Sequence, residues 1–223
     1  MLLAAGHAPE FRERPLSDPE LAPIREAIEV ILAAHEPNPA VVVNRYWDVV
    51  AANSPMAALG DWVDPTLLEP PLNAMRVGLH PRGLARWIVN LGEVRAYFLG
   101  RLERQVAFTG DPKLASLLDD VARCPGPDHE RNGASGAAAQ ILAPTMRMRT
   151  PDGRDLAFLA TVATFGTAIE VTTSELSIEL AFPADSATAA ALKNIARSVS
   201  PTHPETQRPP AKGHDGSAAG LRE

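Results

Sequence analysis

The sequence predicts an α+β domain, an antiparallel sheet with helices packed on one face and a helical insertion between its strands. Up to about residue 122, apolar residues recur mostly with a helical period of about 3.6 residues. After residue 140 the period changes to that of a half-buried strand, in which alternate residues are apolar. A pair of short β-branched runs near residue 45 supplies two earlier strands. Strands separated from helices in this way indicate an α+β domain.

The first regular element is a helix that starts near Pro23. Ser17 and Pro19 resemble a helix start, but a proline at position 23 would clash within a helix that was already running. We therefore expect a turn first and then the helix. Its inward stripe consists of Ile24, Ala27, Ile28, Ile31 and Leu32.

Residues 40–43 and 47–50 follow as two short strands, with a tight turn at Asn44 and Arg45. A short helix to residue 59 comes next, capped by Asn53 or Ser54. Because both strands are short and β-branched, we expect them to form the edge of the sheet.

The longest predicted helix covers residues 83–107. Its inward stripe consists of Leu84, Trp87, Ile88, Leu91, Val94, Phe98 and Leu102, and the residues off this stripe are Arg86, Glu93, Arg95 and Arg101. Residues 109–112 end this helix and start another, which covers residues 112–121. The composition of residues 125–139 predicts a flexible connection.

Three strands and a helix complete the domain. Pro151, Asp152 and Gly153 predict a hairpin between a strand near residues 141–148 and a return strand at 156–165. A short extended piece is expected at 169–171. The next strand alternates Leu176, Ile178 and Leu180 with Ser177, Glu179 and Ala181, and a helix capped at Asp185 ends near Val199.

Composition limits the classes of function. The chain has 223 residues, 45% hydrophobic and 22% charged, which suits one globular domain with irregular ends. The net charge of −6 disfavours electrostatic binding to nucleic acid. One cysteine, Cys124, excludes an intramolecular disulfide, and no run of residues is long and apolar enough for a membrane helix. We therefore expect a cytoplasmic protein without a membrane partner.

Several short motifs follow one another in order along residues 20–198. They read AVVVNRYWDVVAAN at 40–53, LNAMR at 72–76 followed by His80 and Pro81, WIVNL at 87–91, TPDG at 150–153, ATFGT at 163–167, and LSIE at 176–179 followed by FPAD at 182–185. In this order they resemble the MmyB-like ligand-binding domain, which follows an Xre-type helix-turn-helix in many bacterial transcription regulators.

The resemblance implies a PAS-like fold and a fatty-acid-like small-molecule partner. It divides the chain into a linker remnant at residues 1–16, after a helix-turn-helix that is missing here, and a ligand-binding domain at 17–199. The tail at 200–223 is rich in Pro, Gly, His and charge, which predicts disorder. DNA would then be a partner only through that helix-turn-helix. A homodimer is a further possible partner.

Asn73, Arg76 and His80 form the polar group that we select as a candidate ligand site. On a helix these residues, spaced by three and four positions, share one face. Arg76 could hold a carboxylate through a two-pronged, charge-assisted contact. The alternative is that Asn73 caps a helix and Arg76 pairs with a nearby acid.

A set of aromatic residues and one methionine could line a lipid-sized pocket around that group. The set consists of Trp47, Trp62, Met75, Trp87, Phe98, Phe158 and Phe165. An ordinary core explains each of them equally well. The pattern therefore leaves core and ligand pocket open.

We expect no catalytic residue, no metal site and no cofactor. The six histidines are scattered without metal-ligand spacing, and no Gly-rich phosphate loop is present. Two alternatives remain: a small isomerase-like or cyclase-like enzyme that uses Asp61 or Asp64 as a base, and a dimerisation module with a filled core. A buried carboxylate with a raised pKa would favour the enzyme.

Overall fold

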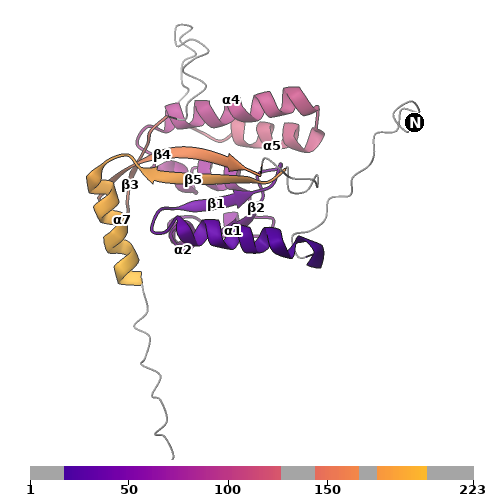
Figure 1. The fold of residues 1–223 in the computed structure, drawn as a ribbon. Helices are drawn as coiled ribbons and strands as arrows, with labels where there is room; N and C mark the ends of the chain where they lie inside the picture. The colour runs from indigo at the N-terminus through magenta and orange to yellow at the C-terminus, as the bar shows by residue number, and fades with distance from the viewer. Residues whose placement is uncertain (1–17, 127–143, 166–174, 200–223) are drawn as a thin grey trace, which may run out of the picture.

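A computed structural model describes residues 18–126, 144–165 and 175–199 (Figure 1). The helices are α1 (Ala22–Ala34), α2 (Ser54–Ala57), α3 (Ala74–Leu79), α4 (Leu91–Thr109), α5 (Pro112–Ala122) and α7 (Ser186–Val199), with 3-10 turns at Pro19–Leu21, Ala58–Trp62, Pro65–Leu68 and Leu84–Trp87. The strands are β1 (Ala40–Val43), β2 (Val49–Ala52), β3 (Met146–Arg149), β4 (Asp155–Thr164) and β5 (Ser177–Pro183).

Some expectations lie outside the described residues. They concern the linker at 1–16, the tail at 200–223, most of the connection at 125–139, the start of the strand at 141, and the extended piece at 169–171.

The five strands form one antiparallel sheet in the order β2-β1-β5-β4-β3, which confirms the predicted α+β class. β5 is the middle strand, between β1 and the ten-residue β4. Val42 lies opposite Ile178 of β5, and both are fully buried. The early strand pair is joined to the three late strands through β1 and β5, far apart in the sequence.

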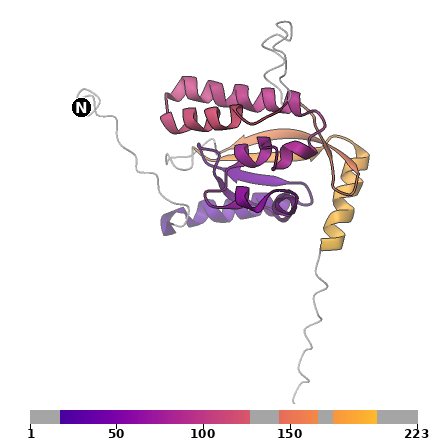
Figure 2. The ribbon, with the colours of Figure 1, turned by 180° about the vertical axis from the view of Figure 1, so that it is seen from behind.

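Helices cover both faces of the sheet, whereas the sequence suggested one face. On one face α1 packs through Ile28 and Leu32 against Ala40 and Val42. On the other face α3, α4 and α5 pack against Val41 and Val43 of the same strand (Figures 1 and 2). Because successive strand residues point to opposite faces, all four residues of β1 are buried.

Among the described residues, three apolar clusters make up the core. The α1 cluster comprises Ile28, Leu32, Ala40, Val42, Leu176 and Ile178. On the opposite face, the Trp47 cluster comprises Val41, Val43, Trp47, Met75, Leu79, Leu102, Leu114, Leu117 and Val121. The Phe158 cluster comprises Ile88, Val94, Met148, Leu156, Phe158 and Leu192. Half-buried Phe98 packs against both the Trp47 and the Phe158 clusters.

The predicted helix at 83–107 is wrong in its first part, because Leu84–Trp87 is a 3-10 turn, Ile88 is extended, and residues 89 and 90 form a turn. Ile88 forms an isolated bridge with Met148, and the amide of Val89 donates to the carbonyl of Arg147 over 2.7 Å. The side chain of Asn90 accepts from the amide of Arg147 (2.9 Å) and donates to the carbonyl of residue 145 (2.9 Å). Pairing with the distant β3 thus replaces helical hydrogen bonds, and α4 begins only at residue 91.

The turn between β1 and β2 is longer than predicted. The side-chain oxygen of Asn44 accepts from the amides of Tyr46 (2.9 Å) and Asp48 (3.0 Å). Trp47 within the turn has a positive φ of 66°, a conformation that bulky residues rarely adopt. β2 therefore begins two residues later than the sequence suggested.

Several local predictions are confirmed. Asn53 caps α2 by accepting from the amide of Met56 (3.2 Å), and Gly153 has a φ of 84° in the β3–β4 hairpin. Asp185 caps α7 by accepting from the amide of Thr188 (2.7 Å). Among the described helices, none combines the length and the apolar composition needed to cross a bilayer.

Candidate functional site

Trp47 is fixed between the β1–β2 turn and α4. Its indole N–H donates to the side-chain oxygen of Gln105 (3.0 Å), and the amide nitrogen of Gln105 donates to the carbonyl of Arg45 (2.7 Å). The ring is 5% exposed. One glutamine of α4 therefore holds both the turn and the tryptophan.

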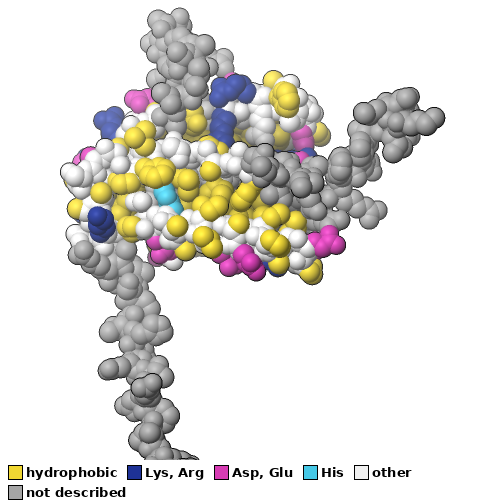
Figure 3. All heavy atoms as spheres, viewed as in Figure 1, with side chains coloured by type: hydrophobic (Ala, Val, Ile, Leu, Met, Phe, Trp, Pro, Cys, Tyr) yellow, Lys and Arg dark blue, Asp and Glu magenta, His cyan; other side chains and the backbone are white. Residues whose placement is uncertain are grey.

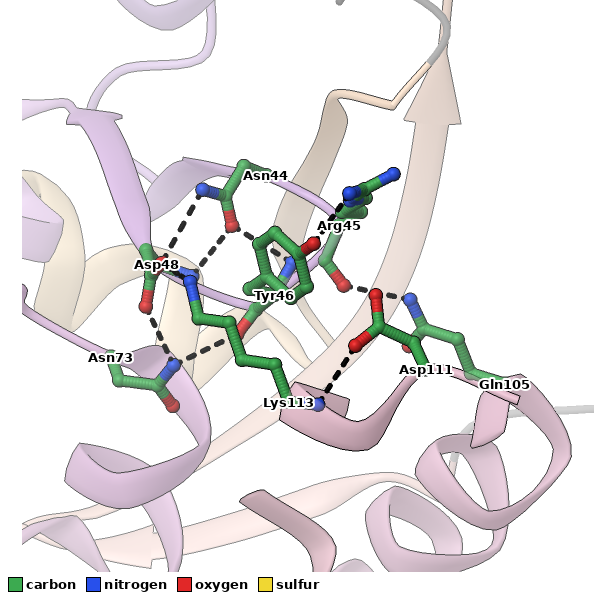
Figure 4. Close-up of polar contacts among 8 residues, drawn as sticks. All are labelled: Asn44, Arg45, Tyr46, Asp48, Asn73, Gln105, Asp111 and Lys113. Atoms are coloured by element: carbon green, nitrogen blue, oxygen red, sulfur yellow. Dashed lines mark hydrogen bonds and ion pairs between the residues drawn. The ribbon is translucent and has the colours of Figure 1, made fainter. Parts of the chain in front are cut away.

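Asn73 ties α3 to the same turn (Figure 4). Its side-chain nitrogen donates to the carbonyl of Tyr46 (2.9 Å) and to the carboxylate of Asp48 (3.0 Å). Its side-chain oxygen accepts from the amide of Arg76 (3.3 Å) and so caps α3. Asn73 is 5% exposed, so these bonds replace its contacts with water.

Charged groups surround the outer side of the turn (Figure 4). The ammonium of Lys113 lies 3.7 Å from the centre of the Tyr46 ring and 3.4 Å from the Asp48 carboxylate. Arg45 contacts the Tyr46 hydroxyl and pairs with Glu175 (2.9 Å). Burial raises the pKa of Tyr46, against the opposing effect of Arg45. Together these contacts connect the turn to α5 through Lys113 and to the start of β5 through Glu175.

On its inner side, Trp47 meets an arginine of α4. The guanidinium carbon of Arg101 lies 4.5 Å from the centre of the Trp47 ring, a cation–π contact. Phe98, one turn earlier on α4, meets the Trp47 ring edge-on with centroids 6.2 Å apart. Arg101 reaches from this aromatic pair to Glu179 of β5, with Nη1 and Oε1 2.9 Å apart.

The Arg101–Glu179 pair lies between α4 and the middle strand of the sheet. The cross-strand neighbours of Glu179 are both apolar, Val41 on β1 and Val162 on β4. The Glu179 side chain is 16% exposed, and burial raises the pKa of its carboxyl, although the positive charge of Arg101 acts in the opposite direction. The two meeting atoms are shielded from solvent and are not aligned for a regular hydrogen bond with any described residue.

Next to this pair, the side chains of β4 become more exposed along the strand. On the α4 side of the strand, Phe158 is buried, Ala160 is half-buried, and Val162 is 41% exposed. Val162 is the residue directly opposite Glu179. Along this side of β4, exposure of apolar side chains therefore increases from Phe158 to Val162, which lies beside the half-buried ion pair.

A comparison with protein-family models identifies this arrangement. Residues 24–195 match the model described as the MmyB-like transcription regulator ligand binding domain. The chain belongs to this family. The matched range runs from α1 to α7 and includes the sheet, the turn and the Arg101–Glu179 pair. No match was found among curated proteins.

Within this ligand-binding domain, six of the seven apolar residues selected from the sequence lie on the face of the sheet that α4 covers, here called the α4 face. Trp47 and Met75 lie in the Trp47 cluster, and Phe158 lies in the Phe158 cluster with Trp62 and Trp87 packed beside it. Phe98 joins the two clusters. Phe165 differs, because it packs against the α1 cluster on the opposite face.

The three members of the polar group Asn73, Arg76 and His80 make different contacts in the structure. Asn73 is a helix cap, as the alternative held. The guanidinium of Arg76 is 47% exposed and pairs with Asp120 over 2.8 Å. His80 ends α3, and its Nδ1 accepts from the amide of Arg82 (3.1 Å).

Sequence reasoning missed Arg101, Gln105 and Glu179 as site residues. Arg101 lies off the apolar stripe of its helix, and Glu179 stands at an alternate position of its strand. Both positions predict solvent exposure when only one face of the sheet is covered. Because helices cover the second face of the sheet as well, both side chains lie between α4 and the sheet. The apolar neighbours of Glu179 become apparent only from the strand register.

The carboxylates considered for catalysis lie elsewhere. Asp64 caps a 3-10 turn and pairs with Arg82 (2.8 Å), and its pKa is lowered by hydrogen bonds from Thr66. Asp61 is exposed. Among the described residues, no cluster of three His, Cys, Asp or Glu side chains could hold a metal ion.

Proposed function

We propose that this ligand-binding domain senses a fatty-acid-like molecule for a cytoplasmic, Xre-type helix-turn-helix regulator. The supporting observation is a half-buried ion pair beside Phe98, which packs against two apolar clusters, with the exposed Val162 directly opposite Glu179. An amphipathic ligand needs both parts, a wide apolar surface for its chain and a charged group for its head.

The magnitudes permit such a ligand. Burial of about twelve methylenes at ~0.8 kcal/mol each yields roughly 10 kcal/mol. Ordering of the chain and loss of translational freedom remove several kcal/mol. With a charge-assisted contact of about 1.5–3 kcal/mol, micromolar affinity is within reach.

In this proposal DNA is reached only through a helix-turn-helix joined to the domain. Ligand occupancy can change DNA binding only if the ligand binds two states of the regulator with different affinity. The net charge of −6 agrees with a sensor that leaves DNA contact to another domain.

Native mass spectrometry of the purified chain tests the proposal. We expect a fraction of the protein to carry an added mass of a few hundred daltons, removable by organic extraction and identifiable as an amphiphile. A chain that carries no such mass, and that takes up no fatty acid when incubated with a mixture of them, would contradict the sensor.

The dimerisation alternative is supported by an apolar surface on the α1 face of the sheet. The cross-strand neighbours Leu159 and Phe182 are 47% and 40% exposed, and Val30 of α1 is 68% exposed. Figure 3 shows hydrophobic side chains gathered over the sheet and α1. Sedimentation of Leu159→Glu against the parent distinguishes this role, since a dimer built on this face would dissociate.

The enzyme alternative now depends on Glu179, a buried carboxylate with a raised pKa. It predicts that a bound ligand is converted. Mass analysis of ligand recovered after incubation separates the two functions, because a sensor returns the ligand unchanged.

A further inference from the structure

We propose that Arg101, and not Arg76, holds the anionic head group of the ligand, and that Glu179 occupies the place of that group when no ligand is bound. The inference rests on the proposed function and identifies the anchor and the regulation of the same site. The starting observation is that Glu179, a carboxylate on the middle strand, lies between two valines and pairs with one arginine, Arg101.

Arg101 is well prepared to bind a second carboxylate. The guanidinium of Arg101 lies over the Trp47 ring, with its carbon 4.5 Å from the ring centre, and Trp47 is itself held by Gln105. A guanidinium presents several N–H donors in a planar fork. Nη1 of Arg101 lies 2.9 Å from Oε1 of Glu179, but neither atom makes a regular hydrogen bond with a described residue. The guanidinium therefore still has N–H donors for another acceptor.

The surroundings also suit the chain of an amphiphile. Phe98 beside Arg101 belongs to both apolar clusters of the α4 face. Val162, next to Glu179, is 41% exposed and continues into the half-buried Ala160 and the buried Phe158. A head group at Arg101 would therefore place an acyl chain along apolar side chains. Arg76 offers no such continuity, because it pairs with Asp120 on the exposed side of α3 and α5.

Binding of an anion changes the charge balance at Glu179. Two carboxylates would then face one guanidinium, and like charges at short distance cannot both stay ionised at low cost. Glu179 is relieved by taking up one proton from solvent, so the complex contains one proton more than the separate protein and anion. The other charged pair near the start of β5 is Arg45 with Glu175, in which Arg45 also contacts the Tyr46 hydroxyl, and the strand neighbours of Glu179 are apolar.

The uptake of a proton by Glu179 determines how the affinity for the anion changes with pH. Because the complex binds one more proton, the affinity for the anion rises as pH falls, by at most about tenfold per pH unit. This slope applies between the pKa of Glu179 in the free protein, already above its ordinary value, and its still higher pKa in the complex. Below that window the slope vanishes.

The test compares three ligands of equal chain length, dodecanoic acid, dodecane-1-sulfonate and dodecanol, on the full delipidated chain between pH 5.5 and 8.5. The sulfonate stays ionised throughout, so its pH dependence reports protein groups alone. We expect sulfonate affinity to rise as pH falls and dodecanol affinity to stay constant. A flat sulfonate profile would overturn the role of Glu179.

Variants complete the test. Arg101→Gln should weaken binding of both anions about tenfold or more and leave dodecanol within threefold, as expected for loss of a charge-assisted bond. Glu179→Gln should strengthen anion binding at pH 8 and abolish the pH slope. Arg149→Gln, at the exposed Arg149–Asp155 pair, is the matched control and should behave as the parent. If Arg101→Gln does not fold, Arg101→Lys replaces it, with loss of the two-pronged contact and a smaller drop.

The outcomes are distinguishable. Anion binding that Arg101→Gln leaves intact, or that Arg76→Gln removes, overturns the anchor while the sensor stands. Weaker anion binding in Glu179→Gln overturns the proposal that Glu179 occupies the place of the head group when no ligand is bound. If the parent binds none of the three ligands below ~100 μM, the proposed function fails together with this inference.

Discussion

The side-chain amide of Asn73 donates to the backbone carbonyl of Tyr46 over 2.9 Å, and thereby joins the start of α3 to the β1–β2 turn. The same side chain caps α3. One residue thus connects the helical insertion to the strand pair that carries Trp47. The helix cap is a local bond, but the bond to Tyr46 joins residues 27 positions apart and cannot be predicted from neighbouring residues.

Asn73→Ala should lower the free energy of unfolding by about 2–4 kcal/mol. About 1 kcal/mol comes from the lost helix cap, and about 1–3 kcal/mol from a buried carbonyl left without a donor. Urea unfolding measures the change. Asn73→Asp keeps the cap acceptor but removes the donor and adds a carboxylate beside Asp48, so it should recover less than half of the loss. Full recovery would show that only the cap matters.

Gly83→Ala should destabilise the domain by at least about 1–3 kcal/mol, because the added Cβ would lie 2.1 Å from the backbone oxygen of Val77. Gly78→Ala is the matched control, since nothing lies within 4 Å of its Cβ position in α3. The control should be neutral or more stable by up to about 1 kcal/mol. Equal melting temperatures for the two variants would contradict the close contact at Gly83.

Arg76→Ala should change the free energy of unfolding by less than about 1 kcal/mol. Its ion pair with Asp120 joins two side chains that are 47% and 40% exposed, and exposed pairs contribute little. Denaturant unfolding at low and high salt measures the effect. A loss above about 2 kcal/mol would mean that Arg76 supports the fold in a way that its contacts do not explain.

The pH dependence of stability should report Glu179. Burial raises the pKa of this carboxyl in the folded state, so the folded protein binds the proton more tightly than the unfolded chain does. The resulting stabilisation is fully present below the ordinary pKa of 4.5 and is lost as pH rises through the raised pKa. The difference in unfolding free energy between Glu179→Gln and the parent should therefore shift in favour of the variant as pH rises from 4.5. A pH-independent difference would contradict the raised pKa.

Local signals in the sequence predicted a large part of the fold. Asn53 and Asp185 cap helices through their own side chains, and Gly153 supplies the positive φ of a hairpin, so neighbouring residues suffice to identify them. The family motifs identified the ligand-binding domain, and the family match confirms it.

The remaining features depend on residues far apart in the chain. The apolar stripe of residues 83–107 fits a helix, yet Asn90 bonds to residues 145 and 147, and the long helix begins only after it, at residue 91. Arg101 and Glu179 occupy polar positions in amphipathic patterns, and they are covered only because helices pack on both faces of the sheet. Arg76 shows the converse, because its spacing from Asn73 and His80 is helical but its side chain is directed to Asp120 at the surface.

Isothermal titration of the delipidated chain with dodecanoic acid at pH 7 measures whether the domain binds a fatty acid. We expect saturable binding of one acid per chain with a dissociation constant in the micromolar range, and a negative heat-capacity change from apolar burial. Absence of binding below ~100 μM for dodecanoic acid and for the other acids from C8 to C18 would contradict a fatty-acid-sensing domain.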